Sequence, residues 1–275
     1  MNKIDGNYVG LQEKLKIDCE KCSALCCVAL FCSRTDGFPE NKDAGIPCKH
    51  IKNDFRCDIH SKLVSKKMRG CLAYDCFGAG QKVTQLYPFG VDWKSNPNQA
   101  DEIFQVFMIV FQLHQMEWYL IEALSLAVDE HLKSDIMELI SQDEQMTAQR
   151  PDEILRLDVD SYRQNVNQTL KKVSEEITTS HSGCVKDFFG KDFKRANLDG
   201  RDFSMSLMIA ANLEGCSLRH ASFLGADMRD ANIKNTDLSQ CAFLTQMQIN
   251  SAKGNGNTKL PQNLLLPDSW KELGA

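Results

Sequence analysis

The large apolar residues in the last third of the chain recur every five positions. A small residue usually stands two positions before each of them, and an Asp or Asn one position before. Neither the α-helix, with about 3.6 residues per turn, nor the alternating strand repeats with this period. The pattern predicts a chain that turns a corner every five residues and buries one large and one small side chain on each face. The twelve large residues are Phe188, Phe193, Leu198, Phe203, Met208, Leu213, Leu218, Phe223, Met228, Ile233, Leu238 and Phe243.

The middle of the chain has the apolar spacing of helices. From Pro97 onward, large apolar residues recur at intervals of three and four, which predicts a first long helix. Ser134 is the candidate cap of a second helix running to about residue 146, and Asp160 of a third running to about residue 177. Residues 91–185 carry 7 basic and 17 acidic side chains, so this part is interpreted as an acidic helical connector. His114 has no second metal ligand nearby and is interpreted as structural.

The run Ala226-Asp227-Met228-Arg229-Asp230-Ala231-Asn232-Ile233 resembles the consensus of the pentapeptide-repeat family. The resemblance implies a right-handed quadrilateral β-helix with four pentapeptides per coil, so that twelve repeats would make three coils. Residues 244–261 resemble the closing tail of such proteins. Cys216 and Cys241 fall at the small interior position and are predicted to be packing residues.

The charge of this repeat limits the functions that we expect for it. Some members of the family block DNA gyrase by imitating DNA with a long acidic rod. Here the repeat is short, and residues 186–245 balance eight acidic against eight basic side chains, so we predict no inhibition of gyrase. The net charge of −5 gives no reason to expect a nucleic-acid or membrane partner. A docking surface for a protein partner of unknown identity is the favoured function of the repeat.

The sequence contains no obvious membrane or export segment. The most apolar run, Ile103–Met116, has 14 residues, whereas a bilayer span needs about 20. Residues 1–17 contain lysines and lack the apolar stretch of a signal peptide. We therefore expect a cytoplasmic protein, whose thiols stay reduced and whose clustered cysteines bind metal more readily than they form disulfides.

Nine of the twelve cysteines lie between residues 18 and 81. Cys19, Cys22 and Cys26 would share one face of a helix, and Cys27 would project about 100° away, which suits a second metal or a local break in the helix. Thiolates must approach zinc to about 2.3 Å, which favours closely spaced pairs with later cysteines closing the loops. Large apolar side chains are few here, so metal binding is expected to supply the folding energy. The predicted metal ligands are Cys19, Cys22, Cys26, Cys27, Cys48, Cys57, Cys71 and Cys76.

This arrangement resembles the CxxCxxCC family of zinc- or iron-chelating domains. Beyond the first four cysteines, the resemblance rests on Phe55-Arg56-Cys57-Asp58-Ile59-His60 and on Tyr74 between Cys71 and Cys76. Some relatives are protein-lysine methylating enzymes that use iron, which implies an alternative function as an Fe–S-dependent redox or protein-modifying enzyme. No catalytic residue can be assigned, and Gly78-Ala79-Gly80 lacks the third glycine of a dinucleotide-binding loop.

Several interpretations of the cysteines stay open. Scattered buried thiols fit the clustering poorly, and a disulfide framework fits neither the odd number of cysteines in the cluster nor a reducing compartment. Zinc would make the region structural, whereas an iron–sulfur cluster would permit electron transfer, sensing or radical chemistry. Cys32 is interpreted as a non-ligand, and His50 and His60 as ligands or as neighbours of ligands.

Together these patterns predict a multidomain α+β protein. A metal-held cysteine module occupies residues 1–95 and a helical connector residues 96–181. A pentapeptide-repeat β-helix, which is a β-solenoid, spans residues 182–249, and a capping tail residues 250–275. The predicted function is metal binding, with zinc or alternatively iron or an iron–sulfur cluster as cofactor, and with the repeat as a scaffold. A non-catalytic role is favoured over an enzymatic one.

Overall fold

The computed structural model describes residues 10, 12–127, 129–179 and 186–271. The chain divides into two compact units. The first comprises Met1–Cys71, Asp75–Ser125 and Asp129–Thr169, and the second comprises Leu72–Tyr74, Leu126–Val128 and Leu170–Ala275. The predicted division into four segments along the sequence stays a prediction.

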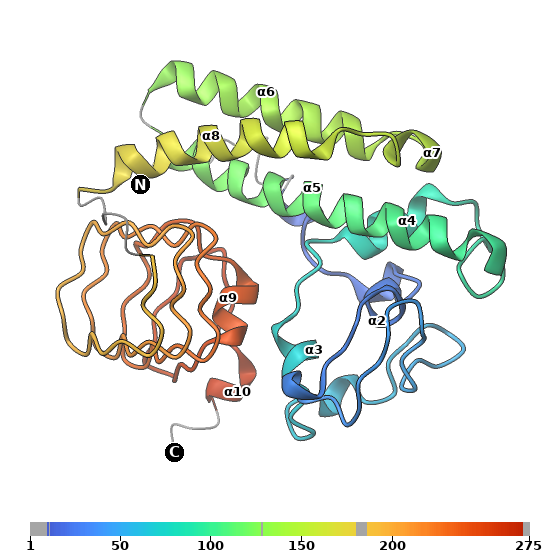
Figure 1. The fold of residues 1–275 in the computed structure, drawn as a ribbon, viewed down its shortest axis with the longest axis horizontal. Coiled ribbons are helices and arrows are strands. Elements are labelled where there is room, and N and C mark those ends of the chain that lie inside the picture. Colours follow the sequence, from blue (N-terminus) through green and yellow to red (C-terminus); the bar gives the residue numbers. More distant parts are fainter. Residues whose placement is uncertain (1–9, 11, 128, 180–185, 272–275) are drawn as a thin grey trace. The chain divides into compact units, whose positions relative to one another are not determined.

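Helices are the main regular elements of the described chain (Figure 1). In order they are η1 (Cys19–Lys21), α2 (Leu25–Ala29), η2 (Arg34–Asp36), η3 (His60–Lys62), α3 (Arg69–Ala73), α4 (Ala79–Leu86), η4 (Pro97–Gln99), α5 (Ala100–Leu126), α6 (Glu130–Thr147), α7 (Pro151–Ile154), α8 (Val159–Ile177), α9 (Gln246–Ser251) and α10 (Asp268–Lys271), where η marks a 3₁₀ helix.

The long helix α5 is apolar around most of its circumference, and a helix with that pattern is buried rather than amphipathic. Its buried side chains begin at Ile103 and continue to Ala123. One of them is His114, whose ring Nδ1 donates a hydrogen bond to the carbonyl oxygen of Phe77 at 2.7 Å. The interpretation of His114 as a structural residue therefore accounts for only one of its two ring nitrogens, Nδ1.

Helices α6 and α8 begin where aspartates cap them. The Asp129 carboxylate accepts a hydrogen bond from the Leu132 N–H group (2.9 Å), so α6 starts at Glu130 and the prediction of a cap at Ser134 is wrong. The Asp158 carboxylate accepts from the Ser161 N–H group (3.0 Å), so Asp160 lies within α8 and does not cap it. In both cases the side-chain oxygen satisfies a first-turn N–H group that has no partner within the helix.

The cysteine-rich part of the first unit has an apolar core of its own. Leu25, Val28 and Val83 are fully buried, and the buried Phe77 ring lies 5.8 Å from the Trp118 ring. The prediction that this region has too few apolar side chains to fold by burial alone stays a prediction, because part of this burial is against α5. The sequence-based reasoning missed side chains such as Phe77, which is buried by a helix distant in the sequence.

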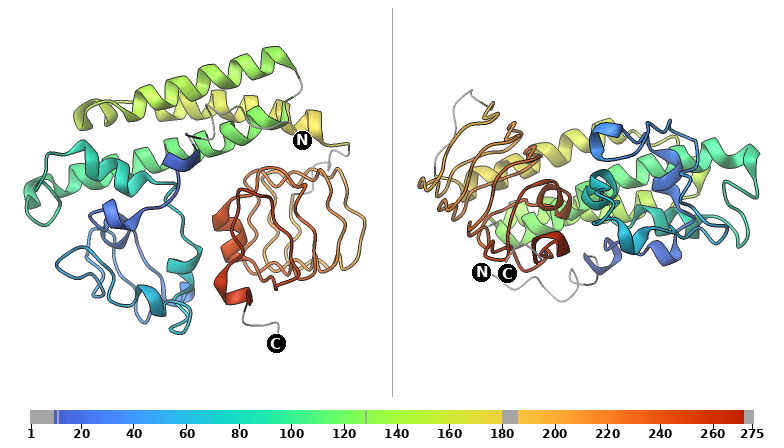
Figure 2. Two further views of the ribbon diagram at one scale, coloured as in Figure 1. Left: turned by 180° about the vertical axis from the view of Figure 1, so that it is seen from behind. Right: turned by 90° about the horizontal axis from the view of Figure 1, so that it is seen from below.

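In the second unit, the repeat forms turns of twenty residues that lie over one another (Figures 1 and 2). Parallel bridges join residues twenty apart, from Asp187 with Leu207 to Ser222 with Ala242. All twelve large apolar residues of the five-residue pattern are buried. The ring of Phe203 lies 5.3 Å from that of Phe223 at an interplanar angle of 25°, so neighbouring turns stack their aromatic residues inside.

Each five-residue segment of the repeat ends in a tight turn. The N–H group three residues after a large apolar residue donates to its carbonyl, as Lys191 does to Phe188 at 3.0 Å. The residue before that donor has a positive φ, which is the geometry of a type II turn. These positions recur every five residues as Gly190, Arg195, Gly200, Met205, Ala210, Gly215, His220, Gly225, Asp230 and Asn235.

The predicted α+β class and C-terminal β-helix are wrong. Across the described residues no strand or sheet forms, and the pairing in the repeat consists of isolated bridges. The reason is that nearly every segment has a single bridging residue before the chain enters its next turn, so the bridges stay isolated and do not extend into a ladder. By its regular elements the described chain is mostly helical.

The repeat's period ends at α9. Thr245 and Gln248 form a capping box, and the Gln248 side-chain amide donates to the carbonyls of Phe223 and Ala226, each at 2.9 Å. A final turn then bridges Lys253 to Asn232 and Lys259 to Asp237, so the spacing lengthens from twenty residues to 21 and 22.

Candidate functional site

The first four candidate cysteines lie on two short helices and not on one. Cys19 begins η1, Cys22 ends it in an extended conformation, and Ala24 has a left-handed conformation with φ 60°. The chain is held in this break by the Ser23 backbone, whose N–H group donates to the Thr84 hydroxyl (3.0 Å) and whose carbonyl accepts from Trp93 Nε1 (2.6 Å). The local break predicted as one option is therefore what separates Cys22 from Cys26.

The two sulfurs of α2 lie close together, and those of Cys22 and Cys76 lie beside Gly80 of α4. The Sγ atoms of Cys26 and Cys27 are 3.9 Å apart. A Cβ atom built on Gly80 would lie 2.6 Å from the Cys22 sulfur and 3.9 Å from the Cys76 sulfur, so a larger residue there would displace the Cys22 side chain. Two sulfurs on one tetrahedral zinc ion, each at about 2.3 Å, would be about 3.8 Å apart.

Hydrogen bonds to backbone groups connect the segment of Cys48 and Cys57 to the first cysteines. The Cys48 N–H group donates to the Cys27 carbonyl at 3.0 Å, and Cys57 bridges Ile51. The Arg56 guanidinium donates to the carbonyls of Cys19 and Glu20, both at 3.1 Å. Residues 48–57 are thereby tied to α2 and η1.

The thiols that influence one another electrostatically fall into two sets, which are joined through Cys27 because it also acts on Cys19 and Cys26. The first set is Cys19, Cys22, Cys26 and Cys76. The second is Cys27, Cys48, Cys57 and Cys71. Cys32, predicted as a non-ligand, also lies beside the second set, near Cys27 and Cys48.

Most of these thiols are protonated at neutral pH. Burial raises the pKa of Cys19 and Cys76 to about 11 and that of Cys71 to about 12, with smaller contributions from neighbouring thiolates and, for Cys76, first from Asp75. The hydrogen bond between the two α2 thiols raises the pKa of Cys26 and lowers the pKa of Cys27. A metal that binds here must therefore displace protons.

The predicted metal-held module is not what the described residues form. Among them, no three His, Cys, Asp or Glu side chains are arranged to hold a metal ion. The cysteines that the structure describes are free thiols, and Cys184 lies outside the described residues. The fold class is therefore wrong on this point too, because the described residues form no metal-binding group.

The two candidate histidines of this region differ in their surroundings. His50 Nδ1 lies 2.9 Å from the Asp58 carboxylate, in a pair between half-buried and exposed side chains. His60 is an exposed residue at the start of η3. Neither is brought into a group of metal-ligating side chains.

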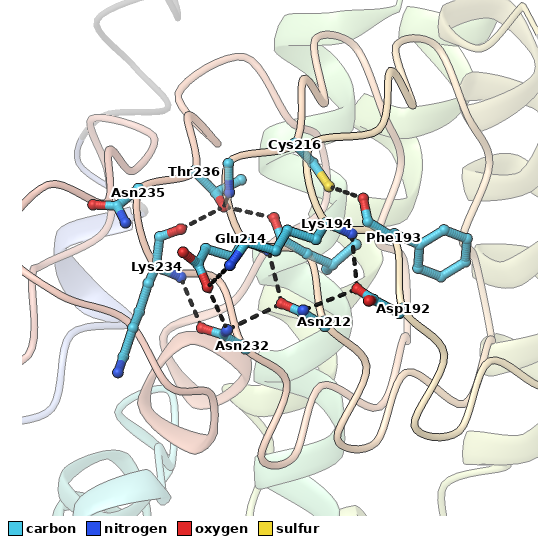
Figure 3. A network of polar contacts seen from close by, with 12 residues as sticks. Asp192, Phe193, Lys194, Asn212, Glu214, Cys216, Asn232, Lys234, Asn235 and Thr236 are labelled. Carbon is cyan, nitrogen blue, oxygen red and sulfur yellow. Dashed lines mark hydrogen bonds and ion pairs between the residues drawn. The ribbon is translucent and has the colours of Figure 1, made fainter.

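The polar residue before each large apolar residue has a function that its sequence position alone did not reveal. Its side-chain oxygen accepts a hydrogen bond from the N–H group two residues on, as Asp192 does from Lys194 (3.0 Å). On one face, these side chains also bond to one another across turns (Figure 3). The Asn212 amide donates to Asp192 (2.9 Å), and the Asn232 amide donates to Asn212 (3.0 Å).

The buried cysteines of the repeat are packing residues, as predicted. Cys216 Sγ donates to the Phe193 carbonyl at 2.9 Å, and Cys241 Sγ donates to the Leu218 carbonyl at 3.1 Å. Thr236 occupies the equivalent position and donates to the Leu213 carbonyl at 2.8 Å. The small interior residue therefore also links successive turns.

These turns define the class of the C-terminal part, because pentapeptide repeats match residues 206–243 in eight copies. The match does not reach the cysteine-rich region, so the resemblance to the CxxCxxCC family stays a prediction. The whole chain is similar to the uncharacterized protein YybG of Bacillus subtilis (strain 168), with 41% identity over 265 residues, 94% of this chain and 95% of that protein. The chain therefore belongs to the same family as YybG.

No solved structure matches the chain. Within the described residues, no helix has both the length and the apolar composition that a membrane span requires.

Proposed function

We propose that the chain is a metal-binding protein that loads zinc, or alternatively iron, onto the cysteines of residues 19–76 and uses its repeat to dock a protein partner. The observation that carries the proposal is that eight thiols from residues 19–27, 48–57 and 71–76 influence one another electrostatically, although no three of them among the described residues form a ready metal site. A set of four thiolates is the ligand number of a closed zinc site.

The docking role is supported by the surface of the repeat. Phe189, Met205 and Leu207 are large apolar side chains that point outward and are at least 47% exposed. The turns themselves are fixed by backbone bridges and by the side-chain ladder, so this surface is rigid. A rigid surface loses little conformational entropy when a partner binds.

Metal content of the full chain, purified anaerobically without chelator, tests the proposal. Two zinc ions per chain are expected, one for each set of thiols. Cys76→Ser and Cys57→Ser change one set each and should each lose one ion. Cys216→Ser is the matched control, because it changes a buried repeat thiol and should leave the metal content unchanged.

The outcomes separate the alternatives. Iron with acid-labile sulfide and visible absorbance would replace the zinc interpretation with the iron–sulfur one, and would make an enzymatic activity the next question. Metal-free protein after growth with added zinc and iron, or an unchanged metal content in both variants, would contradict the proposal.

A further inference from the structure

An open cavity of about 760 Å³ lies in the first unit, and no cysteine lines it. Residues 13–18 and α4 line one side of it, and α5 and α6 contribute His114, Glu117 and Thr147. Its volume falls within the range of about 300–1,000 Å³ that is usual for sites of small organic molecules.

The buried end of the cavity offers hydrogen-bond acceptors. His114 and Glu117 are each only 5% exposed, and they lie one turn apart on the same face of α5. Since His114 Nδ1 donates to the Phe77 carbonyl, the other nitrogen, Nε2, has a free lone pair. Burial lowers the pKa of His114 to about 4, so the ring stays neutral at physiological pH.

Glu117 is a buried carboxyl group without a partner. Among the described residues it makes no hydrogen bond and no ion pair. An unpaired carboxylate in such a place is costly, and that cost is removed when a cation binds beside it. Behind it, Asp143 is fully buried and neither of its carboxyl oxygens has a hydrogen-bond partner.

Three of the four lysines around the cavity are paired with carboxylates, and the fourth, the half-buried Lys82 of α4, acts electrostatically on both Glu117 and His114. Lys14 pairs with Glu144 at 3.0 Å, Lys16 with Glu13 at 2.5 Å and Lys21 with Asp18 at 2.8 Å. Their side chains are at least 61% exposed, so they lie in solvent and not at the buried end. A ligand that reaches the bottom therefore meets the Glu117 carboxyl group and the His114 lone pair.

We propose that this cavity binds a small organic cation with a primary ammonium group, which pairs with the Glu117 carboxylate and donates a hydrogen bond to His114 Nε2. An ammonium group has three donors and no acceptor, which matches a site composed of acceptors. The remainder of the ligand lies toward the exposed rim, where the paired lysines and carboxylates favour a polar or charged chain.

Binding should depend on pH. Burial and the nearby Glu144 raise the pKa of Glu117 to about 7, while Lys14 and Lys82 act in the opposite direction. Asp143, whose pKa is also raised by burial and by Glu117, faces it from α6, and Tyr162 lies beside Asp143 on α8. The ionised fraction of Glu117 therefore rises about tenfold between pH 6 and pH 8.

Ligand-observed NMR titrations of the full chain test the proposal with four probes of similar length: 1,4-diaminobutane, 1-aminobutane, 1,4-butanediol and succinate. Both amines are expected to bind, about tenfold more tightly at pH 8 than at pH 6, and the diol and the dianion are not. Glu117→Gln should weaken amine binding at pH 8 at least tenfold. Glu138→Gln removes an exposed carboxylate from α6 and should change the affinity less than twofold.

Three results would overturn the proposal. They are no amine binding at about 10 mM probe and pH 8, equal amine binding by the parent and Glu117→Gln, and binding of succinate or of divalent zinc in place of the amines. A circular dichroism spectrum of Glu117→Gln that matches the parent confirms that any loss of binding is local. If Glu117→Gln does not fold, the same titration of Glu117→Asp provides the equivalent test. This variant has a shorter carboxylate side chain and should fail to bind the amines.

Discussion

Removing the Phe223 ring should destabilise the repeat far more than changing an exposed residue of the same turn. Phe223 is fully buried, and its ring stacks on that of Phe203 at 5.3 Å. Truncating a buried phenylalanine to alanine costs about 3–5 kcal/mol, because it removes apolar burial and leaves a cavity. The narrow interior has turns on both sides that are fixed by parallel bridges, so it cannot collapse to fill the space. We expect Phe223→Ala to lower the free energy of opening of the repeat by about 4 kcal/mol, which raises the opening equilibrium constant nearly a thousandfold.

Amide hydrogen exchange of the full chain, read by mass spectrometry, measures this effect locally. Peptides from residues 186–259 should lose protection by the predicted factor, while peptides of the first unit keep theirs. Arg219→Ala is the control, because Arg219 is exposed and its change should shift the opening free energy by less than about 0.5 kcal/mol. Equal protection in the two variants would show that the five-residue pattern does not define the interior.

Two further predictions concern the backbone and the buried acid. Ala210 is exposed and has φ 56°, so Ala210→Gly should stabilise the chain against urea by about 0.5–1 kcal/mol. Gly215 has φ 67° and no atom closer than 3.6 Å to an added Cβ, so Gly215→Ala should destabilise the chain by a similar amount. Changes of the opposite sign would refute the turn geometry. Glu117 keeps its proton in the folded chain up to a pKa of about 7, against an ordinary value of 4.5, so the parent loses stability as pH rises between these values. Glu117→Gln should therefore be more stable than the parent by about 3 kcal/mol at pH 8 but not at pH 4, as measured by thermal unfolding; no gain at pH 8 would contradict the burial of an unpaired carboxyl.

The sequence by itself determined the interior of the repeat. The twelve large residues that recur every five positions are all buried, since in a narrow turn the side-chain direction follows directly from position in the period. The sequence also predicted the helical middle, although it misplaced the cap of α6 by five residues. Asp129 and Ser134 are both good caps, and the choice between them depends on which of them precedes the packed face.

The tertiary structure decided the bridges, the break between η1 and α2, and the buried acid. A five-residue period is compatible with a ladder or with single bridges, and the turn at each corner leaves room for one bridging residue. The spacing of Cys19, Cys22 and Cys26 permits one helix, but Trp93 and Thr84 hold the Ser23 backbone out of it. The sequence position of Glu117 does not distinguish it from the other residues of α5. Only the packing of α4, α5 and α6 shows that it lies unpaired at the bottom of a cavity. Contacts between residues far apart in the chain carry no periodic signal, so they could not be predicted from it.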